Sequence, residues 1–404
     1  MNDRTVPGAG SMRKWPWLIL LLAVGNLVFL TLFADRDGYE GDDLNMVVPT
    51  AHLAAAKQGA LLIYRYAWQP LSFELSSWLW SLFGTPTAVF LSMPVAGGIA
   101  IGMFLWWLWR EGNERTNALT YAIVALLCIP ELWYSSVFYN TTMRAMPLIA
   151  LALILVRMSG SILLPLGAGV ATGLAILMRL DFLLVCPLLA MAAWPKGDGI
   201  MRPVVLAVGV IATILAGFAA GLIDLPAILR INAFNSWEIK AHLGQPGWDM
   251  RLKAMVITVV LSPVGWLLLL IGAPLLLLEA VRKRDWRVLL WILFAIPPAL
   301  PLPNILSPKY LLPLAPFALL FFLRAQEAIE DALASGLRDW ARRGLLVAAT
   351  LPMFLSVSLS GKAPFLMPGL SPAKPIPTHD GPRGWGGYAW QIMETDAPAS
   401  KPEQ

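Results

Sequence analysis

The chain has 404 residues, of which 58% are hydrophobic and 14% are charged, and its formal net charge is +5. A soluble domain has roughly 45–50% apolar residues, so this composition excludes a soluble globular protein. The small positive charge indicates basic cytoplasmic loops and no nucleic-acid partner. Cys128 and Cys186 both lie within apolar segments, which predicts buried cysteines without disulfide or metal-site spacing.

Apolar stretches recur along the chain and predict an all-α, polytopic transmembrane helix bundle. A hydrocarbon core about 30 Å thick needs ~20 apolar residues per helix, and the runs suggest roughly eleven spans. We expect the first to be retained, because it is long for a signal peptide and lacks a cleavage site before Asp35. The predicted spans are 15–33, 88–109, 118–138, 143–157, 161–178, 180–194, 203–223, 255–278, 288–303, 310–323 and 344–360.

A structured outer loop is predicted after the first span, at residues 34–87. Its beginning, "DRDGYEGDDLNMVVP", is rich in carboxylates, which repel one another unless water or a task stabilises them. Its second half, "YRYAWQPLSFELSSWLWSLFG", alternates apolar and polar residues. This pattern favours short helices in the membrane interface, with tryptophans at the headgroup level. The five clustered carboxylates are Asp35, Asp37, Glu40, Asp42 and Asp43.

The basic residues orient the bundle, because they fall on one side of the predicted spans and that side is cytoplasmic by the positive-inside rule. Residues 1–14 are then a cytoplasmic N-terminus, 15–360 the transmembrane domain and 361–404 an irregular tail. The stretch from Arg324 to Arg343 is predicted to be a separate cytoplasmic amphipathic helix. The expected location is the inner (plasma) membrane, crossed many times, with the loop 34–87 facing outward.

Ionisable residues inside a membrane are costly and usually functional, so their placement is informative. The predicted span centres are nearly free of charge, whereas the outward ends collect it. This favours a site at the outer membrane boundary, assembled from several loops. The charged residues at these ends are Asp42, Asp43, Glu131, Arg144, Arg179, Asp181 and Lys309.

Several of these residues also have a purely structural interpretation. Asp42 could cap the next helix, because aspartate accepts hydrogen bonds from free N–H groups at a helix start. Arg179 and Asp181 could form only a local ion pair. Lys309 could extend its charge to the interface, and Glu131 could be a solvated helix end.

No cofactor is predicted from the sequence. His52 and His242 lie on outward segments, but no ligand spacing such as His-x-x-x-His is present, so a divalent metal is left open without support. The chain also has no Gly-rich phosphate loop, Ser-His-Asp arrangement or zinc-hydrolase signature.

Four short stretches, taken in chain order, resemble motifs of one known group. They are "YEGDDLNMV", the segment that begins "WQPL" and ends "LFG", "GLAILMRLDFLLVCPLL" and "SPKYLLPLAPFALLFF". Their order and predicted topology resemble the GT-C superfamily of membrane glycosyltransferases, and the pattern is most similar to protein O-mannosyltransferases and the aminoarabinose transferases of lipid A. The resemblance covers most of residues 15–323.

The chain departs from the family pattern in two motifs. It has Lys309 and Tyr310 where the family usually has Arg-Tyr, and Asp42 and Asp43 where the family often has Asp-Glu. Lysine keeps the positive charge of arginine but loses its bidentate fork.

The resemblance implies transfer of a sugar, with inversion, from a polyprenyl-phosphate carrier to a hydroxyl of a glycan, lipid or protein on the outer (periplasmic) face. Residues 15–360 would form the GT-C-like catalytic domain, surrounded by membrane lipids. Asp42 or Asp43 would accept the hydroxyl proton. Arg179 and Lys309 would bind the phosphate and stabilise it as it gains charge. Further candidates for the site are Glu131, Arg144 and Tyr310.

Two other functions stay open at this stage. A transporter or lipid flippase would bind its substrate near the midplane, with broken helices and paired repeats. The chain has Pro-rich spans such as "AIPPALPLP", but no two matching halves and few central charges. The other is a catalytically silent relative that binds a lipid-linked glycan or assists a partner complex. Normal sugar transfer after loss of both Asp42 and Asp43 would favour it.

Overall fold

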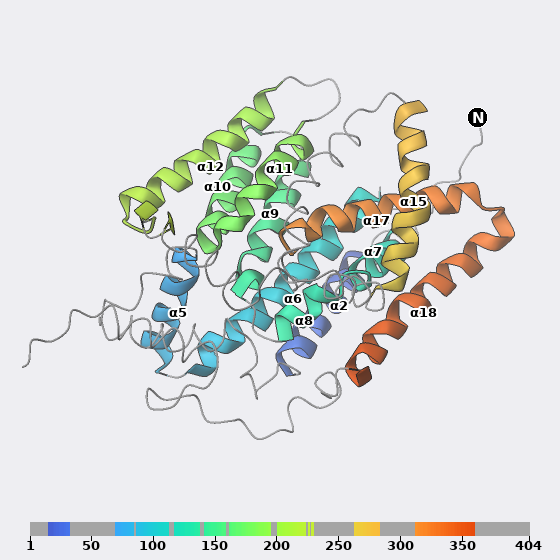
Figure 1. Cartoon of the computed structure of the whole chain (residues 1–404), viewed down its shortest axis with the longest axis horizontal. Coiled ribbons are helices and arrows are strands. Elements are labelled where there is room, and N and C mark those ends of the chain that lie inside the picture. The colour runs from blue at the N-terminus through green and yellow to red at the C-terminus, as the bar shows by residue number, and fades with distance from the viewer. Residues whose placement is uncertain are drawn as a thin grey trace, which may run out of the picture.

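The computed structural model describes much of the predicted membrane domain. Within the described residues every regular element is a helix, which confirms the predicted all-α class (Figure 1). The described residues are 15–32, 69–84, 86–112, 117–137, 141–158, 161–194, 200–223, 225–226, 228–229, 262–282 and 312–359.

The helices follow the apolar runs of the sequence. They are α2 (Trp15–Leu32), α5 (Pro70–Phe83), α6 (Pro86–Glu111), α7 (Ala118–Leu127), α8 (Pro130–Val137), α9 (Met146–Arg157), α10 (Leu163–Met178), α11 (Cys186–Ala192), α12 (Met201–Ala219), α15 (Pro263–Arg282), α17 (Ala315–Ala332) and α18 (Ser335–Leu359). Two 3₁₀ turns, η2 (Thr141–Arg144) and η3 (Leu180–Val185), precede α9 and α11.

Three helical segments are long and apolar enough to cross a membrane, judged by length and composition: Leu91–Glu111, Met201–Ala219 and Leu312–Ala332. Several shorter apolar helices accompany them. The expectation of roughly eleven spans stays a prediction, since the span 288–303 lies outside the described residues. The division into a cytoplasmic N-terminus, a membrane domain and a tail stays a prediction as well.

Three expected elements differ from the structure. The span predicted at 180–194 is divided into η3 and α11, with Pro187 at the start of the α-helical part. The span predicted at 118–138 is broken into α7 and α8 at Pro130, which has no backbone N–H and cannot continue a helix from the preceding turn. The amphipathic stretch 324–343 is not a separate helix. Its first part continues α17 to Ala332, with no Gly or Pro between it and the preceding apolar run. Its second part begins α18 at Ser335, and α18 runs through Gly344 into the next apolar run.

Helix α6 lies at the centre of the bundle. It packs against α2, α7, α8 and α9, while α10 and α12 lie together on one side and α15, α17 and α18 on the other (Figure 1). Small residues allow the closest approaches: a Cβ on Gly209 of α12 would stand 2.5 Å from the Leu166 carbonyl oxygen of α10. Packing through small residues is typical of helices within membranes, where the surrounding lipid is as apolar as leucine.

The contacts between α6 and α9 define two ends of the bundle. Near the start of α6, Ser92 accepts a hydrogen bond from Arg144, which directly precedes α9. At the other end of both helices, Glu111 pairs with Arg157. Ser92 and Glu111 are about 28 Å apart along the helix at 1.5 Å per residue, close to the ~30 Å of a hydrocarbon core. We call these levels the Arg144 end and the Glu111 end.

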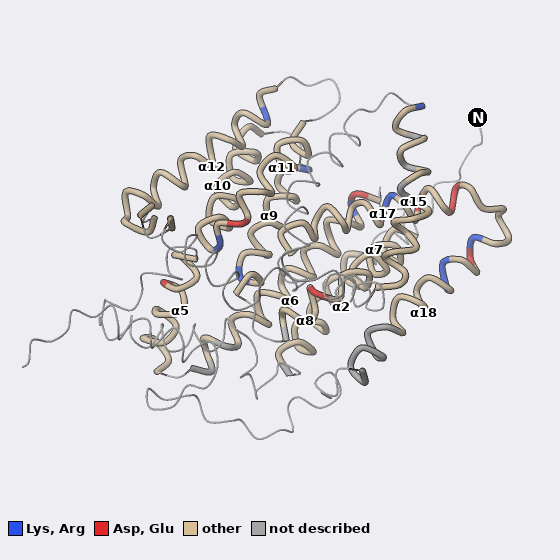
Figure 2. Tube along the Cα trace, in the orientation of Figure 1, with Lys and Arg blue, Asp and Glu red and all other residues tan. Residues whose placement is uncertain are grey.

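Charge is scarce between these two levels. Figure 2 shows long uncharged stretches of helix, with most Lys, Arg, Asp and Glu positions close to helix ends. This agrees with the prediction that the centres of the spans carry almost no charge, and it places the polar chemistry at the two ends.

Candidate functional site

Arg144 lies in a buried position at the end of η2, with 4% of its surface exposed. All three nitrogens of its guanidinium donate hydrogen bonds. Nε reaches Ser92 Oγ at 3.0 Å, and Nη2 reaches the same oxygen at 2.8 Å and the Val89 carbonyl at 3.1 Å. Nη1 reaches the Ser72 carbonyl at 2.8 Å, Ser72 Oγ at 3.1 Å and Ser76 Oγ at 2.5 Å. These oxygens are neutral and belong to α5 and α6.

Arg179 occupies the break between α10 and η3. Its extended backbone, with φ −164° and ψ 119°, ends α10, and its amide still bonds the Ala175 carbonyl at 3.0 Å. The side chain is as buried as that of Arg144, and Nε lies 2.9 Å from Asp181 Oδ2. The local ion pair that the sequence suggested is therefore present, and it fixes one edge of the guanidinium.

The two arginines lie at the same end of the bundle. Helix α10 runs antiparallel to α9, and Gly167 near its start packs beside Leu155 near the end of α9. The last turn of α10, which precedes Arg179, therefore returns to the level of Arg144. Both α5 and η2 also contact α10. The structure therefore brings these two predicted residues to one end of the bundle, and their membership in an outward-facing site stays a prediction.

Other polar atoms at this end have no hydrogen-bond partner within the described part of the chain. They are Gln69 Oε1 at the start of α5, Thr141 Oγ1 in η2 and Asp181 Oδ1. Each buried polar atom without a hydrogen-bond partner lowers the stability of the folded state by roughly 1–3 kcal/mol. The Gln69 and Asp181 oxygens accept hydrogen bonds, so they suit a ligand that carries hydroxyl or N–H donors, and Arg179 adds positive charge at the same end.

The remaining predicted site residues have different outcomes. Glu131 lies half-buried in the first turn of α8, where the helix dipole favours a negative charge. Asp42, Asp43, Lys309 and Tyr310 lie outside the described residues, so their place in the site stays a prediction.

The Glu111 end has a different chemistry, because several of its arginines pair with carboxylates near the surface. Glu111 lies 3.1 Å from Arg157 and 3.6 Å from Arg324, which also contacts Glu327 at 2.7 Å. Arg342 of α18 joins this end through three further partners. These are Glu330 at 3.5 Å, Asp339 at 2.5 Å and the Asn117 side chain.

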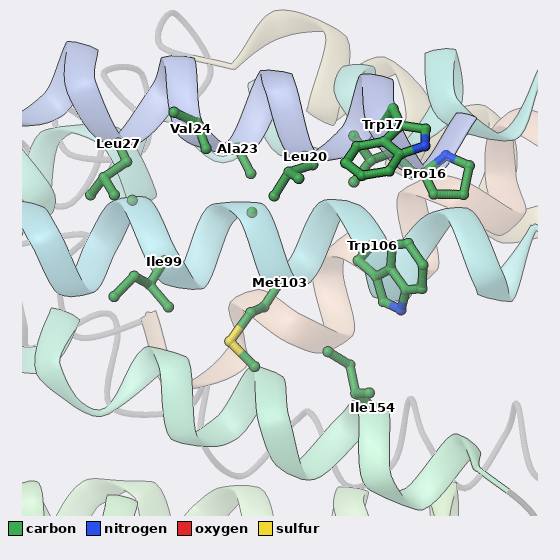
Figure 3. Close-up of a pocket in the computed structure, with 13 residues that line it drawn as sticks. Pro16, Trp17, Leu20, Ala23, Val24, Leu27, Ile99, Met103, Trp106 and Ile154 are labelled. Carbon is green, nitrogen blue, oxygen red and sulfur yellow. The ribbon is translucent and has the colours of Figure 1, made fainter. Parts of the chain in front are cut away.

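An apolar groove of about 540 Å³ lies between α2, α6 and α9 (Figure 3). Its polar atoms are few, and the labelled side chains that face it include Trp17, Met103 and Trp106. On α6 its lining runs from Gly98 to Trp106, which places the groove midway between the two ends of the bundle. Such a lining fits hydrocarbon and offers nothing to a phosphate group, so we place the polar chemistry at the Arg144 end.

Metal binding has no support among the described residues, where no group of three or more His, Cys, Asp or Glu side chains comes together. His52 and His242 lie outside those residues. The expectation of no cofactor stays a prediction.

Sequence reasoning missed the serines that bind Arg144. Ser72 and Ser76 are four residues apart and share one face of α5, while Ser92 lies on α6. Two small polar residues at helical spacing among Pro70 and Phe73 were the available signal. They stand about seventy positions before Arg144 in the chain, so only the fold could connect them.

Comparison with known proteins gives one kind of match. No protein-family model matches the sequence, and no curated protein matches it significantly. Two crystal structures of ArnT from Cupriavidus metallidurans are similar. The apo structure has a TM-score of 0.49 at 18% identity, covering 82% of this chain and 62% of that one. The structure bound to undecaprenyl phosphate has a TM-score of 0.52 at 18% identity, covering 85% of this chain and 65% of that one.

The chain thus spans about 65% of the ArnT chain with which it shares its architecture. At this identity the likeness concerns the fold alone. The resemblance to the GT-C group that the motifs suggested is confirmed at that level: this chain has the fold of ArnT.

Proposed function

We propose that this chain is a membrane glycosyltransferase of the GT-C type. It transfers a sugar from a polyprenyl-phosphate carrier to an acceptor hydroxyl, with inversion at the sugar. The fold supports this proposal, because ArnT is an aminoarabinose transferase and one of its structures holds undecaprenyl phosphate. A largely apolar bundle also suits a donor whose lipid tail stays in the membrane.

The observation that carries the proposal is the burial of Arg179 at the Arg144 end. When the bond between sugar and phosphate breaks, a phosphodiester with about one negative charge becomes a monoester approaching two. A cation beside it therefore binds the transition state more tightly than the ground state. Asp181 holds Nε of Arg179 at 2.9 Å, so the guanidinium enters the reaction already oriented.

The other chemical roles belong to the first outer loop and the late motif. Asp42 or Asp43 accepts the proton of the attacking hydroxyl, and Lys309 is the second cation for the phosphate. The acceptor is a glycan, lipid or protein, and the geometry of the described residues does not select among them.

The Arg144 end faces outward in this proposal, and the chain resides in the inner membrane. Lys and Arg near span ends resist translocation, which assigns the Glu111 end to the cytoplasm. Single cysteines at positions 38 and 285 test this orientation with an impermeant thiol reagent. Labelling from outside is expected at 38 alone, and labelling at 285 alone would reverse the orientation.

The test of function is transfer by the purified chain. Reconstituted protein is given polyprenyl-phosphate sugars of known headgroup with candidate acceptors, and release of polyprenyl phosphate is measured by mass spectrometry. We expect release with one sugar class and its loss in Arg179→Met. Cells lacking the protein should accumulate that same carrier. Movement of the intact carrier across the bilayer without cleavage would instead identify the flippase alternative.

A further inference from the structure

Arg144 connects three elements that are far apart in the sequence. It belongs to η2, and it donates to Ser72 and Ser76 of α5 and to Val89 and Ser92 of α6. Ser72 and Ser76 are buried on the face of α5 that meets the bundle, and Ser76 also bonds the Ser72 carbonyl at 3.0 Å. The guanidinium thus stands between two helices and bonds both.

Among the residues that the structure describes, α5 meets the bundle through one buried face. That face is formed by Pro70, Ser72, Phe73 and Ser76. The end of the helix is open, with Trp78, Leu82 and Phe83 each more than half exposed. Two of the four buried residues bond Arg144, so this side chain links the buried face of α5 to α6.

Stability alone is a poor explanation for a buried arginine in this position. Removing a charge from water costs several kcal/mol, and well-packed apolar residues often give equal or greater stability at such sites. A planar guanidinium does supply fixed directions, because its donors form a rigid fork. Apolar contacts tolerate sliding, whereas bonds from both Nη1 and Nη2 to separate helices fix their relative position.

All three nitrogens of the Arg144 guanidinium are engaged by the protein. Nε, Nη1 and Nη2 of Arg144 each donate to oxygens of the protein. A phosphate group would have to displace these bonds before it reached the guanidinium. The geometry therefore favours a role in placing other parts of the site over direct contact with a ligand.

We propose that Arg144 is a positioning residue that holds α5 in a fixed place against α6 and beside the end of α10 that carries Arg179. Helix α5 contacts α10, so its position affects the surroundings of Arg179. The catalytic consequence rests on the function proposed above. The mechanical part, attachment of α5 through Arg144, stands on the described contacts alone.

The experiment measures hydrogen exchange of α5 and turnover in five variants of the full chain. Arg144→Met removes the fork, and Arg144→Lys keeps the charge but cannot reach both helices from one nitrogen. The double variant Ser76→Ala/Ser92→Ala removes acceptors and leaves Arg144 in place. Arg202→Met is the matched control, because Arg202 bonds the Val156 and Met158 carbonyls at the opposite end.

We expect exchange of the α5 amides to rise about 10-fold or more in Arg144→Met and Arg144→Lys, with α10 unchanged, because only the attachment of α5 is lost. Turnover per folded molecule should fall roughly 10²-fold, the effect of a misplaced catalytic group.

The variant Ser76→Ala/Ser92→Ala should show the same changes in smaller degree. Added to Arg144→Met it should have little further effect, since both changes break one bridge. Arg202→Met should leave α5 exchange unchanged.

Several results would overturn the proposal. Unchanged α5 exchange in Arg144→Met contradicts the attachment, and normal turnover with a loosened α5 contradicts its role in placing the site. Full activity in Arg144→Lys would assign Arg144 a charge effect on the ligand instead. If Arg144→Met does not fold, the serine pair decides the same questions. Exchange is measured without substrate, so an inactive wild-type protein would remove the proposed function while still testing the attachment.

Discussion

The two ends of the bundle use arginine in opposite ways. At the Glu111 end, Arg157 and Arg324 are half and about a third exposed and bond carboxylates. At the Arg144 end, Arg144 and Arg179 are almost fully buried, the first among neutral oxygens and the second beside Asp181. Exposed ion pairs contribute little to folding and tolerate change. Buried guanidiniums are costly, so the end that retains them is where we expect function.

The largest effect should come from the carboxylates of the first outer loop, which the proposal assigns to the Arg144 end. Asp→Asn keeps shape and much of the capping ability but removes the base. We expect the true base, Asp42 or Asp43, to lose roughly 10²-fold or more in transfer with the protein still folded. Asp339→Asn, which alters an exposed carboxylate of the Glu111 end, is the control.

Transfer is measured for both single variants, the double variant and the control at equal amounts of folded protein. Normal transfer by the double variant would remove both aspartates from the mechanism.

The next effect should separate the arginines of the two ends directly. Arg179→Met removes a charge that the leaving phosphate requires, and we expect transfer to fall between about 10- and 1000-fold. Arg179→Lys should retain part of the activity, because the charge remains while the fork is lost. Arg157→Met at the Glu111 end should stay close to wild type. Equal losses in Arg179→Met and Arg157→Met, measured per folded molecule, would contradict the assignment of function to one end.

Sequence predicted the helices well where a long apolar run decides the outcome. The run predicted at 88–109 became α6 and that at 203–223 became α12, each within a few residues at most ends. In lipid, the backbone N–H and C=O groups must form their hydrogen bonds within the helix. The length of an apolar run therefore nearly determines where a helix forms. The break at Pro130 could have been read from the missing N–H of proline.

The site was less accessible to sequence, for a physical reason. Arg144 and Arg179 could be identified as candidates because charge is expensive near a membrane. Their difference in role depends on what surrounds each guanidinium, and the serines around Arg144 come from α5 and α6. Hydrogen bonds between distant segments leave no periodic pattern in the chain, so the distinction required coordinates.

A smaller effect, on stability instead of chemistry, should come from the packing between the two ends. Gly209 lies where α12 approaches the α10 backbone, and an added Cβ would stand 2.5 Å from the Leu166 carbonyl. Backbone cannot move aside as a flexible side chain can, so Gly209→Ala should cost about 1–3 kcal/mol of folding free energy.

Gly25→Ala in α2 is the matched control, because nothing lies within 4 Å of its added Cβ. Alanine is the better helix former, so this change should be neutral or mildly stabilising, by up to about 1 kcal/mol. Both are measured by thermal unfolding in the same detergent. Equal stability of the two variants would contradict the close approach of α10 and α12.

The smallest effect should be at the Glu111 end itself. Glu111→Gln leaves an acceptor facing Arg157 and Arg324 and removes only the charge of the carboxylate. Arg324 also bonds the Glu111 backbone carbonyl at 3.2 Å, and that contact survives the substitution. Partly exposed pairs are worth about 0–1 kcal/mol, since water screens them and ordering long side chains costs entropy.

We therefore expect the free energy of unfolding of Glu111→Gln to change by no more than about 1 kcal/mol and its transfer rate to stay within about two-fold of wild type. Raising the salt concentration should shrink the difference in stability further, because exposed charges are screened over ~10 Å at 0.1 M. A loss of transfer as large as that of Arg179→Met, at an unchanged amount of folded protein, would show that this end takes part in the reaction. Burial would then fail to distinguish functional arginines from structural ones in this bundle.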